Sequence, residues 1–157
     1  MIIIAGPTAI GKTELSVQIA EKLKTEIISA DSRQIYREMK IGTAVPEDKI
    51  LQRIKHHLIQ SKSIHDYFNA SMYEVEVTGL LDELFRKFDK VIMTGGSGLY
   101  INAVKYGIDD LPQVDQDLRK QLHHRIEKEG LESLRKELKI LDPETYMKID
   151  LKNPKRI

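Results

Sequence analysis

The chain has 157 residues, of which 41% are hydrophobic and 31% charged, and its formal net charge is +1. This length suits one domain with a single core, and the composition excludes disordered, collagen-like and proline-rich chains. The absence of cysteine excludes disulfides, thiolate metal sites and a cysteine nucleophile. The apolar opening at residues 1–5 ends at Gly6 and has no basic flank, so it is neither a signal peptide nor a membrane span. We therefore expect a cytoplasmic protein.

The first half of the chain alternates short apolar runs with amphipathic stretches. Residues 2–5 are continuously apolar, as in a strand buried on both faces, and they lead into a glycine-containing loop. The stretch after the loop has apolar residues at every fourth position, Leu15, Ile19 and Leu23, which predict one face of a helix. The first unit is thus predicted as strand, glycine loop and helix.

Two further strands are predicted, at residues 27–30, before Asp31, and at residues 91–94, before Gly95. The apolar residues between them keep a helical period. Strands separated by helices form a parallel sheet, and such sheets bind ligands at the carboxyl ends of their strands. The predicted fold class is therefore α/β, a parallel sheet flanked by helices, with the glycine loop and Asp31 at its ligand-binding edge.

From about Pro112 the pattern becomes helical throughout. Two apolar stripes at helical spacing are separated by Gly130, and Asp142 followed by Pro143 is typical of an N-cap with proline at the first helical position. Three consecutive helices are predicted here. We accordingly divide the chain into an α/β core at residues 1–111 and a helical part at residues 112–157.

Residues 6–13 match the phosphate-binding loop pattern G-x-x-x-x-G-K-[ST]. In such loops the backbone N–H groups and the helix N-terminus hold phosphate oxygens, the lysine adds positive charge and the hydroxyl ligates Mg²⁺. A chance match in a chain of this length has odds of roughly 1%. The predicted phosphate-binding residues are Gly6, Pro7, Thr8, Ala9, Ile10, Gly11, Lys12 and Thr13.

The loop alone does not determine which phosphate compound binds. NTPase engines place an acidic residue at a strand end to help hold Mg²⁺, whereas the run at residues 91–93 leads to Thr94-Gly95-Gly96-Ser97 without an acid. This disfavours an NTPase engine. A small-molecule kinase that uses Lys12 and Mg²⁺ on ATP remains an alternative.

Asp31 and Ser97 both follow predicted strands and are candidates for chemistry. Asp31 suits a general base toward an attacking nucleophile, or alternatively an N-cap for a helix at residues 32–36. Ser97 lies among glycines that let the backbone approach a ligand, or it caps the next helix. The neighbouring phosphate loop favours the base for Asp31, while both interpretations of Ser97 stay open.

The histidine pairs are interpreted as core or surface residues rather than metal ligands, and the remaining basic residues as surface residues. His56-His57 and His123-His124 are adjacent, so their side chains diverge on a strand or helix and cannot chelate one ion. The basic residues of the helical part mingle with glutamates, as on a solvated helix face. Only the segment at residues 152–157 is basic without acidic neighbours.

Six segments, in order along the chain, resemble the tRNA dimethylallyltransferase family. The most specific is Asp-Ser-Arg-Gln-Ile-Tyr within residues 28–36, which follows the phosphate loop. The segments are Gly-Pro-Thr-Ala-Ile-Gly-Lys-Thr (6–13), Ile-Ser-Ala-Asp-Ser-Arg-Gln-Ile-Tyr (28–36), Met-Lys-Ile-Gly-Thr-Ala (39–44), His-His-Leu-Ile (56–59), Gly-Gly-Ser-Gly-Leu-Tyr (95–100) and Leu-Asp-Pro-Glu (141–144).

The resemblance implies a P-loop NTPase-like fold and a specific reaction. A dimethylallyl group would pass from dimethylallyl diphosphate to N6 of an adenosine adjacent to the anticodon of tRNA. The diphosphate would lie in the loop, with Lys12 neutralising its charge and Thr13 on Mg²⁺. Asp31 would accept a proton from the N6 amine, and Ser97 would lie near the reacting groups.

The resemblance also implies contacts with the anticodon stem-loop, and the helices from residue 112 would begin a tRNA-binding insertion. It identifies the chain as an N-terminal portion of a longer enzyme, which we expect to be monomeric. A P-loop small-molecule kinase and a non-catalytic phosphate- or RNA-binding module remain the alternatives. The positions that match tRNA contacts are Asp31, Ser32, Arg33, Gln34, Ser97, Arg119, Lys155 and Arg156.

Overall fold

The computed structural model describes residues 1–108, 115–154 and 156–157. The chain divides into two compact units, Met1–Asp110 and Leu111–Ile157. The boundary predicted at residues 111 and 112 falls outside the described residues. Within the described residues, no helix is long and apolar enough to cross a membrane.

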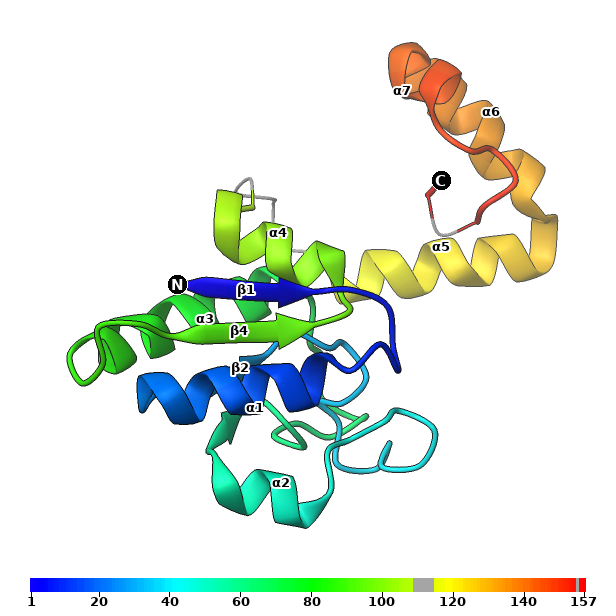
Figure 1. Ribbon diagram of the computed structural model, residues 1–157. Coiled ribbons are helices and arrows are strands. Elements are labelled where there is room, and N and C mark those ends of the chain that lie inside the picture. The colour runs from blue at the N-terminus through cyan, green and yellow to red at the C-terminus, as the bar shows by residue number, and fades with distance from the viewer. Residues whose placement is uncertain (109–114, 155) are drawn as a thin grey trace. The chain divides into compact units, whose positions relative to one another are not determined.

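The first unit is built on a parallel sheet with the strand order β1-β4-β2-β3 (Figure 1). Each neighbouring pair is parallel, which confirms the predicted α/β class. The bounds of two predicted strands differ by one residue from those observed, 27–29 instead of 27–30 and 92–95 instead of 91–94, and β3 was not predicted at all. The strands are β1 (Ile2–Ala5), β2 (Ile27–Ser29), β3 (His56–His57) and β4 (Ile92–Gly95).

Helices cover both faces of this sheet because the central strands are apolar on both faces. Successive side chains of a strand point to opposite faces, so Ile27 and Ile92 pack with α1 while Ile28 and Met93 pack with α3 and α4. The burial on both faces that was predicted for residues 2–5 was wrong, because β1 is an edge strand in which Ile2, Ile3 and Ile4 are only partly buried and Ala5 is exposed. The helices of this unit are α1 (Lys12–Leu23), α2 (Asp48–Arg53), α3 (Ala70–Phe85) and α4 (Gly98–Tyr106).

The buried face of α1 differs from the prediction. Ser16, Val17 and Ala20 are the buried residues of α1, whereas Leu15 is 49% exposed. Residues spaced four apart drift by about 40° per step around a helix of 3.6 residues per turn. The predicted stripe is therefore only partly confirmed: Leu15 is exposed, whereas Ile19 and Leu23 are partly buried and Ile19 packs against the core. Small residues allow α1 to lie close to β2 and β4.

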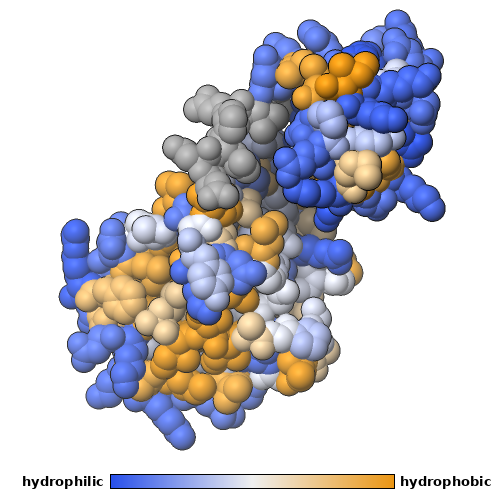
Figure 2. Space-filling model, turned by 90° about the horizontal axis from the view of Figure 1, so that it is seen from above, coloured by the Kyte–Doolittle hydropathy of each residue, from blue (hydrophilic) through white to orange (hydrophobic). Residues whose placement is uncertain are grey.

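β1 is an edge strand that pairs with β4 alone in the part of the chain that the structure describes. Exposed apolar side chains occur on the elements beside it, among them Leu15 on α1 and Leu99 and Tyr106 on α4. Figure 2 shows hydrophobic side chains gathered on the visible face of the first unit. This edge therefore presents unpaired backbone groups next to apolar surface.

A buried tyrosine ties α3 to the centre of the sheet. The hydroxyl of Tyr73 donates to the carbonyl of Ser29 at 2.9 Å, and its ring stacks on Tyr100 with centroids 4.2 Å apart. Burial raises the pKa of the Tyr73 hydroxyl above its ordinary value, so the group stays protonated and can donate.

Tyr73→Phe is expected to lower the free energy of unfolding by about 1 kcal/mol, because the Ser29 carbonyl loses a buried donor. Urea unfolding followed by circular dichroism measures the change. Tyr106→Phe serves as the control, since Tyr106 is 72% exposed. Equal urea midpoints for the two variants would contradict a stabilising role of the Tyr73 hydroxyl.

The second unit consists of three consecutive helices, as predicted. Gly130, with φ at 76°, separates the first two, and Asp142 caps the third by accepting from the backbone N–H of Thr145 at 2.9 Å. Pro143 occupies the first helical position, which confirms the predicted cap. The helices are α5 (Gln116–Glu129), α6 (Leu131–Leu141) and α7 (Pro143–Lys148).

Candidate functional site

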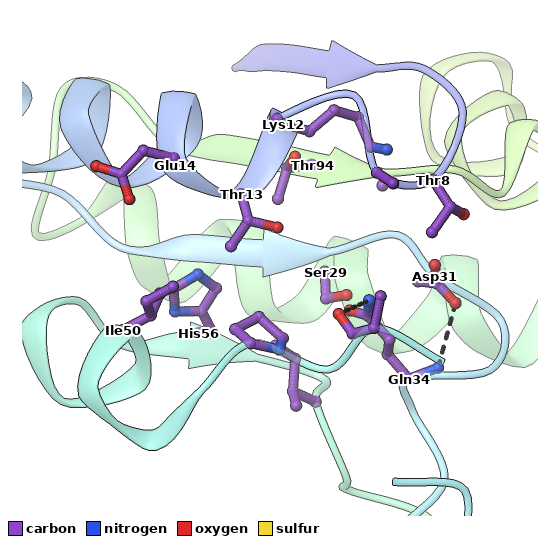
Figure 3. Close-up of a pocket in the computed structure, with 16 residues that line it drawn as sticks. Thr8, Lys12, Thr13, Glu14, Ser29, Asp31, Gln34, Ile50, His56 and Thr94 are labelled. Atoms are coloured by element: carbon purple, nitrogen blue, oxygen red, sulfur yellow. Dashed lines mark hydrogen bonds between the residues drawn. The ribbon is translucent and has the colours of Figure 1, made fainter. Parts of the chain in front are cut away.

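A cavity of about 340 Å³ lies in the first unit, at the carboxyl ends of β1, β2 and β4 (Figure 3). Most of the predicted phosphate loop lines it, together with Asp31 and Gln34. Its wall also includes residues that were not predicted. The lining residues are Thr8, Ala9, Gly11, Lys12, Thr13, Glu14, Ser29, Asp31, Gln34, Ala44, Pro46, Ile50, His56, Ile59, Thr94 and Gly95.

The loop between β1 and α1 leaves the N-terminus of α1 open toward this cavity. Gly11 occupies the N-cap position with φ at 90°, and no side chain caps the helix. The ammonium group of Lys12 donates to the carbonyl of Pro7 at 2.6 Å. Uncapped N–H groups and a nearby ammonium group are the kind of groups that hold anions in proteins.

Asp31 is held at the cavity through one of its two oxygens. Its Oδ1 accepts from the backbone N–H groups of Arg33 at 2.9 Å and Gln34 at 3.2 Å. Residues 32–35 form a turn rather than the helix considered from the sequence, so Asp31 caps a turn. The described residues contribute no hydrogen bond to Oδ2, which remains available to a ligand.

Ser97 occupies the N-cap position of α4, but its side chain does not cap that helix. Its hydroxyl instead accepts from the backbone N–H of Ser32 at 2.8 Å, and its own N–H donates to the carbonyl of Ala30. It lines a second, more open cavity with Thr8 and Asp31. Ser97 therefore fixes the turn that carries Asp31, from a position next to the main cavity.

Close approach of β2 and β4 explains the glycine at the end of β4. A Cβ at Gly95 would lie 2.0 Å from the carbonyl oxygen of Ala30, so only glycine fits without moving a strand. Gly95→Ala is expected to destabilise the protein by about 1–3 kcal/mol. Thermal unfolding tests this, with Gly98→Ala as the control, because a Cβ at Gly98 meets nothing within 4 Å. Equal destabilisation by both changes would contradict the clash.

The wall opposite the phosphate loop comes from the segment between β2 and α2. The side-chain amide of Gln34 donates to the carbonyl of Thr43 at 3.0 Å. It also donates to the carbonyl of Ala44 at 2.9 Å (Figure 3). Pro46 and Ile50 follow and line the cavity. Gln34 thus has a clear structural role in addition to the predicted contact with tRNA.

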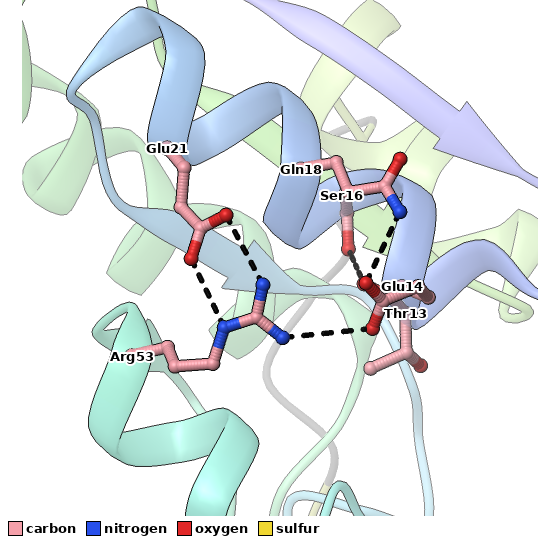
Figure 4. Close-up of polar contacts among 6 residues, drawn as sticks. All are labelled: Thr13, Glu14, Ser16, Gln18, Glu21 and Arg53. Atoms are coloured by element: carbon pink, nitrogen blue, oxygen red, sulfur yellow. Dashed lines mark hydrogen bonds and ion pairs between the residues drawn. The ribbon is translucent and has the colours of Figure 1, made fainter.

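An arginine joins α2 to α1 (Figure 4). The guanidinium of Arg53 donates to both carboxylate oxygens of Glu21, at 3.0 and 3.1 Å, and lies 3.8 Å from Glu14. The hydrogen bond from Arg53 to Glu21 raises the pKa of the guanidinium above its ordinary value. Because α2 has no fully buried residue, these ion pairs help to hold it beside the cavity.

The two histidines of β3 have different surroundings. The Nε2 of His57 lies 2.5 Å from a carboxylate oxygen of Glu26. The Nδ1 of His56 lies 2.8 Å from the carbonyl of Ile54, its side chain lines the cavity, and burial lowers the pKa of its imidazole. The sequence interpretation of His56 as an ordinary residue missed this position. Leu58 and Ile59 directly after the pair, and Ile54 two residues before it, were the available signal for a strand.

Ser32 and Arg33, two of the remaining predicted tRNA contacts, do not line this cavity. Ser32 and Arg33 line the second cavity beside Asp31. Arg119 and Arg156 are exposed residues of the second unit, where Arg119 borders a pocket with His123. Lys155 lies outside the described residues.

Mg²⁺ is compatible with the residues present at the loop. Among the described residues, no cluster of three or more histidine, aspartate and glutamate side chains could hold a metal ion alone. Mg²⁺, however, keeps several waters and binds through few protein groups plus substrate phosphates. The Thr13 hydroxyl, which lines the cavity and makes no hydrogen bond within the described residues, suits that mode.

The chain is similar in sequence and in fold to known proteins. The family model "IPP transferase" matches residues 34–157. tRNA dimethylallyltransferase 1 of Bacteroides fragilis is 50% identical over all 157 residues, which correspond to 52% of its length. A tRNA isopentenylpyrophosphate transferase structure from Bacillus halodurans is 34% identical with a TM-score of 0.66, covering 99% of this chain and 52% of that one.

A eukaryotic dimethylallyltransferase acting on tRNA shares the fold at 22% identity, with a TM-score of 0.76 over 99% of this chain and 39% of that one. The chain spans about half the length of the curated relatives it matches, at 52% for Bacteroides fragilis and Phocaeicola vulgatus.

Proposed function

Because the chain belongs to the IPP transferase family, we propose that it carries the donor and catalytic site of a tRNA dimethylallyltransferase. This enzyme would transfer a dimethylallyl group from dimethylallyl diphosphate to N6 of an adenosine adjacent to the anticodon. The observation that carries the proposal is the single cavity that joins the uncapped N-terminus of α1 and Lys12 to the carboxylate of Asp31.

The phosphate loop would bind the diphosphate, the leaving group of the reaction. The uncapped backbone N–H groups lie at the start of α1, beside the loop. The ammonium group of Lys12 can give up its hydrogen bond to the Pro7 carbonyl and donate to a phosphate oxygen instead. Negative charge builds on the diphosphate as the allylic C–O bond breaks, so donors fixed there lower the barrier. Mg²⁺ on Thr13 would add positive charge to the same group.

Asp31 would act as the general base. The lone pair of N6 forms the new bond to the allylic carbon while the electron pair of the C–O bond leaves with the diphosphate. N6 then carries an excess proton, which Oδ2 of Asp31 accepts. The two backbone N–H groups on Oδ1 fix the carboxylate during this step. No phosphoryl group moves, which agrees with the absence of an acidic residue at the end of β4.

The turn after Asp31 would contact the RNA. Ser32 and Arg33 are exposed beside Asp31, and Ser97 holds their backbone in place. An adenosine flipped out of the anticodon loop can bring its amino group to a carboxylate at such a position. The further tRNA contacts in this proposal are Gln34, Arg119, Lys155 and Arg156.

The proposal is tested by incubating the protein with Mg²⁺, dimethylallyl diphosphate and an anticodon stem-loop that has adenosine next to the anticodon. The mass of the RNA should increase by one dimethylallyl group. A version extended to the length of the relatives is assayed in parallel, since this chain spans about half of them. Phosphoryl transfer from ATP with no prenylation by either version would instead support the small-molecule kinase.

A further inference from the structure

The segment between β2 and α2 exposes a large apolar side chain. Ile41 is 96% exposed, more than any other large hydrophobic side chain of the described residues. Single exposed apolar residues are common on soluble proteins and need no explanation by themselves. Ile41, however, lies in a loop, cyan in Figure 1, that projects from the edge of the sheet at which the strands end. The cavity that contains Asp31 lies at the same edge.

Hydrogen bonds fix the turn that carries Ile41. The hydroxyl of Thr43 is almost fully buried and donates to the carbonyl of Met39. Gly42, with φ at 80°, lets the backbone reverse its direction beside Ile41. The isoleucine is therefore held in solvent at the tip of a closed turn.

This turn is joined to the turn that carries Asp31. The side-chain amide of Gln34 donates to the carbonyl of Thr43, and the backbone N–H of Gln34 donates to Oδ1 of Asp31 at 3.2 Å. Two residues of extended chain span at most about 7 Å, so the backbone of Ile41 lies no farther than that from the backbone of Thr43. An RNA that presents an adenosine to Asp31 therefore has neighbouring nucleotides within reach of Ile41.

Basic side chains surround the tip of this turn. Glu38 is the one acidic residue of the segment 32–44. Its carboxylate is held by another segment, because it accepts from the hydroxyl of Ser63 at 2.8 Å and from the backbone N–H of Ile64 at 3.1 Å. The basic residues make no ion pair within the described residues, so their charge can pair with an anionic partner. They are Arg33, Arg37 and Lys40, and all three are exposed.

An apolar tip among unpaired cations fits a single-stranded nucleic acid. The cations can pair with phosphates. Apolar side chains, isoleucine among them, insert between the bases of nucleic acids, and the unstacked bases of RNA loops are accessible to such contacts. A protein partner would have to supply acidic groups for the cations that it buried.

We infer that residues 37–41 form a contact with the anticodon loop in addition to the turn at residues 32–34. Ile41 packs against a base beside the flipped-out adenosine, while Arg37 and Lys40 pair with flanking phosphates. This inference rests on the proposed function, because it requires the anticodon stem-loop as a substrate.

Three variants separate the apolar contact from the charges. Ile41→Ala removes the apolar tip but keeps the hydrogen bonds of the turn, which are made by other side chains. Arg37→Gln and Lys40→Gln each remove one positive charge. The matched controls are Val75→Ala, whose side chain is 66% exposed on α3, and Lys87→Gln, an exposed lysine between α3 and β4.

Fluorescence anisotropy with the anticodon stem-loop at several salt concentrations measures the affinity and its salt dependence. The assay uses whichever version, this chain or the extended one, binds the RNA. We expect Ile41→Ala to weaken the affinity roughly tenfold at every salt concentration. Arg37→Gln and Lys40→Gln should each reduce the slope of log affinity against log salt by about 0.7. The controls, and the pyrophosphate affinity of all variants, should match the unmodified protein.

Three results would overturn the inference. If the unmodified protein binds the stem-loop and the variants at residues 37, 40 and 41 bind it equally well, this turn does not contact RNA and the proposed function stands. If Ile41→Ala lowers the thermal midpoint of the extended version but not that of this chain, the rest of the longer protein covers Ile41. If neither version binds the stem-loop, the proposed function is wrong and the inference falls with it.

Discussion

Asp31→Asn is expected to lower the rate of dimethylallyl transfer by roughly 10²- to 10⁴-fold, the range that a general base contributes, and to leave pyrophosphate affinity unchanged. The asparagine Oδ1 can still accept from the N–H groups of Arg33 and Gln34, so the turn should keep its shape. The amide nitrogen cannot accept a proton from N6. Chemistry should therefore be lost while the donor site stays intact.

Single-turnover transfer to the anticodon stem-loop measures the first effect, and calorimetry with pyrophosphate measures the second. The assay uses whichever version, this chain or the extended one, gives transfer. Asp66→Asn is the matched control, because Asp66 also accepts a backbone N–H, that of Ser63, but does not line the cavity. An undiminished rate in Asp31→Asn would show that another group takes the proton.

Sequence patterns predict the central strands of this fold well because both faces of those strands are buried. Apolar runs predicted the central strands β2 and β4, and also the edge strand β1, to within one residue, and the glycine loop between β1 and α1 followed from its own motif. Asp142 and Pro143 predicted the start of α7 because capping is a local interaction. Features that depend on local interactions or on a strong periodicity could thus be predicted from the sequence.

The parts that escaped prediction depend on contacts distant in sequence. β3 has only two residues, both histidines, and becomes a strand through its pairing with β2. The wall of the cavity depends on Gln34 reaching two carbonyls nine and ten residues away. Similarly, α2 is held by Arg53 contacts to α1, 32 residues away at Glu21. The hydrophobic periodicity of a segment does not indicate which distant residues it contacts.

Lys12→Ala is expected to weaken pyrophosphate binding by roughly 100-fold, since one or two hydrogen bonds to a charged group are lost from the anion site. Folding should be little affected, because the ammonium group makes one hydrogen bond in the described structure, to the Pro7 carbonyl. Calorimetry gives the affinity. Lys22→Ala is the control, as Lys22 lies in the last turn of the same helix, away from the loop.

Lys12 and Asp31 together separate binding from chemistry. A kinase or a non-catalytic phosphate-binding module would also lose affinity in Lys12→Ala, so this variant tests the anion site alone. Only a transferase has a prenyl transfer rate for Asp31→Asn to lower. If Lys12→Ala binds pyrophosphate with an affinity within twofold of that of the unmodified protein, the diphosphate does not bind at the loop. The proposed mechanism would then be wrong whatever the result with Asp31→Asn.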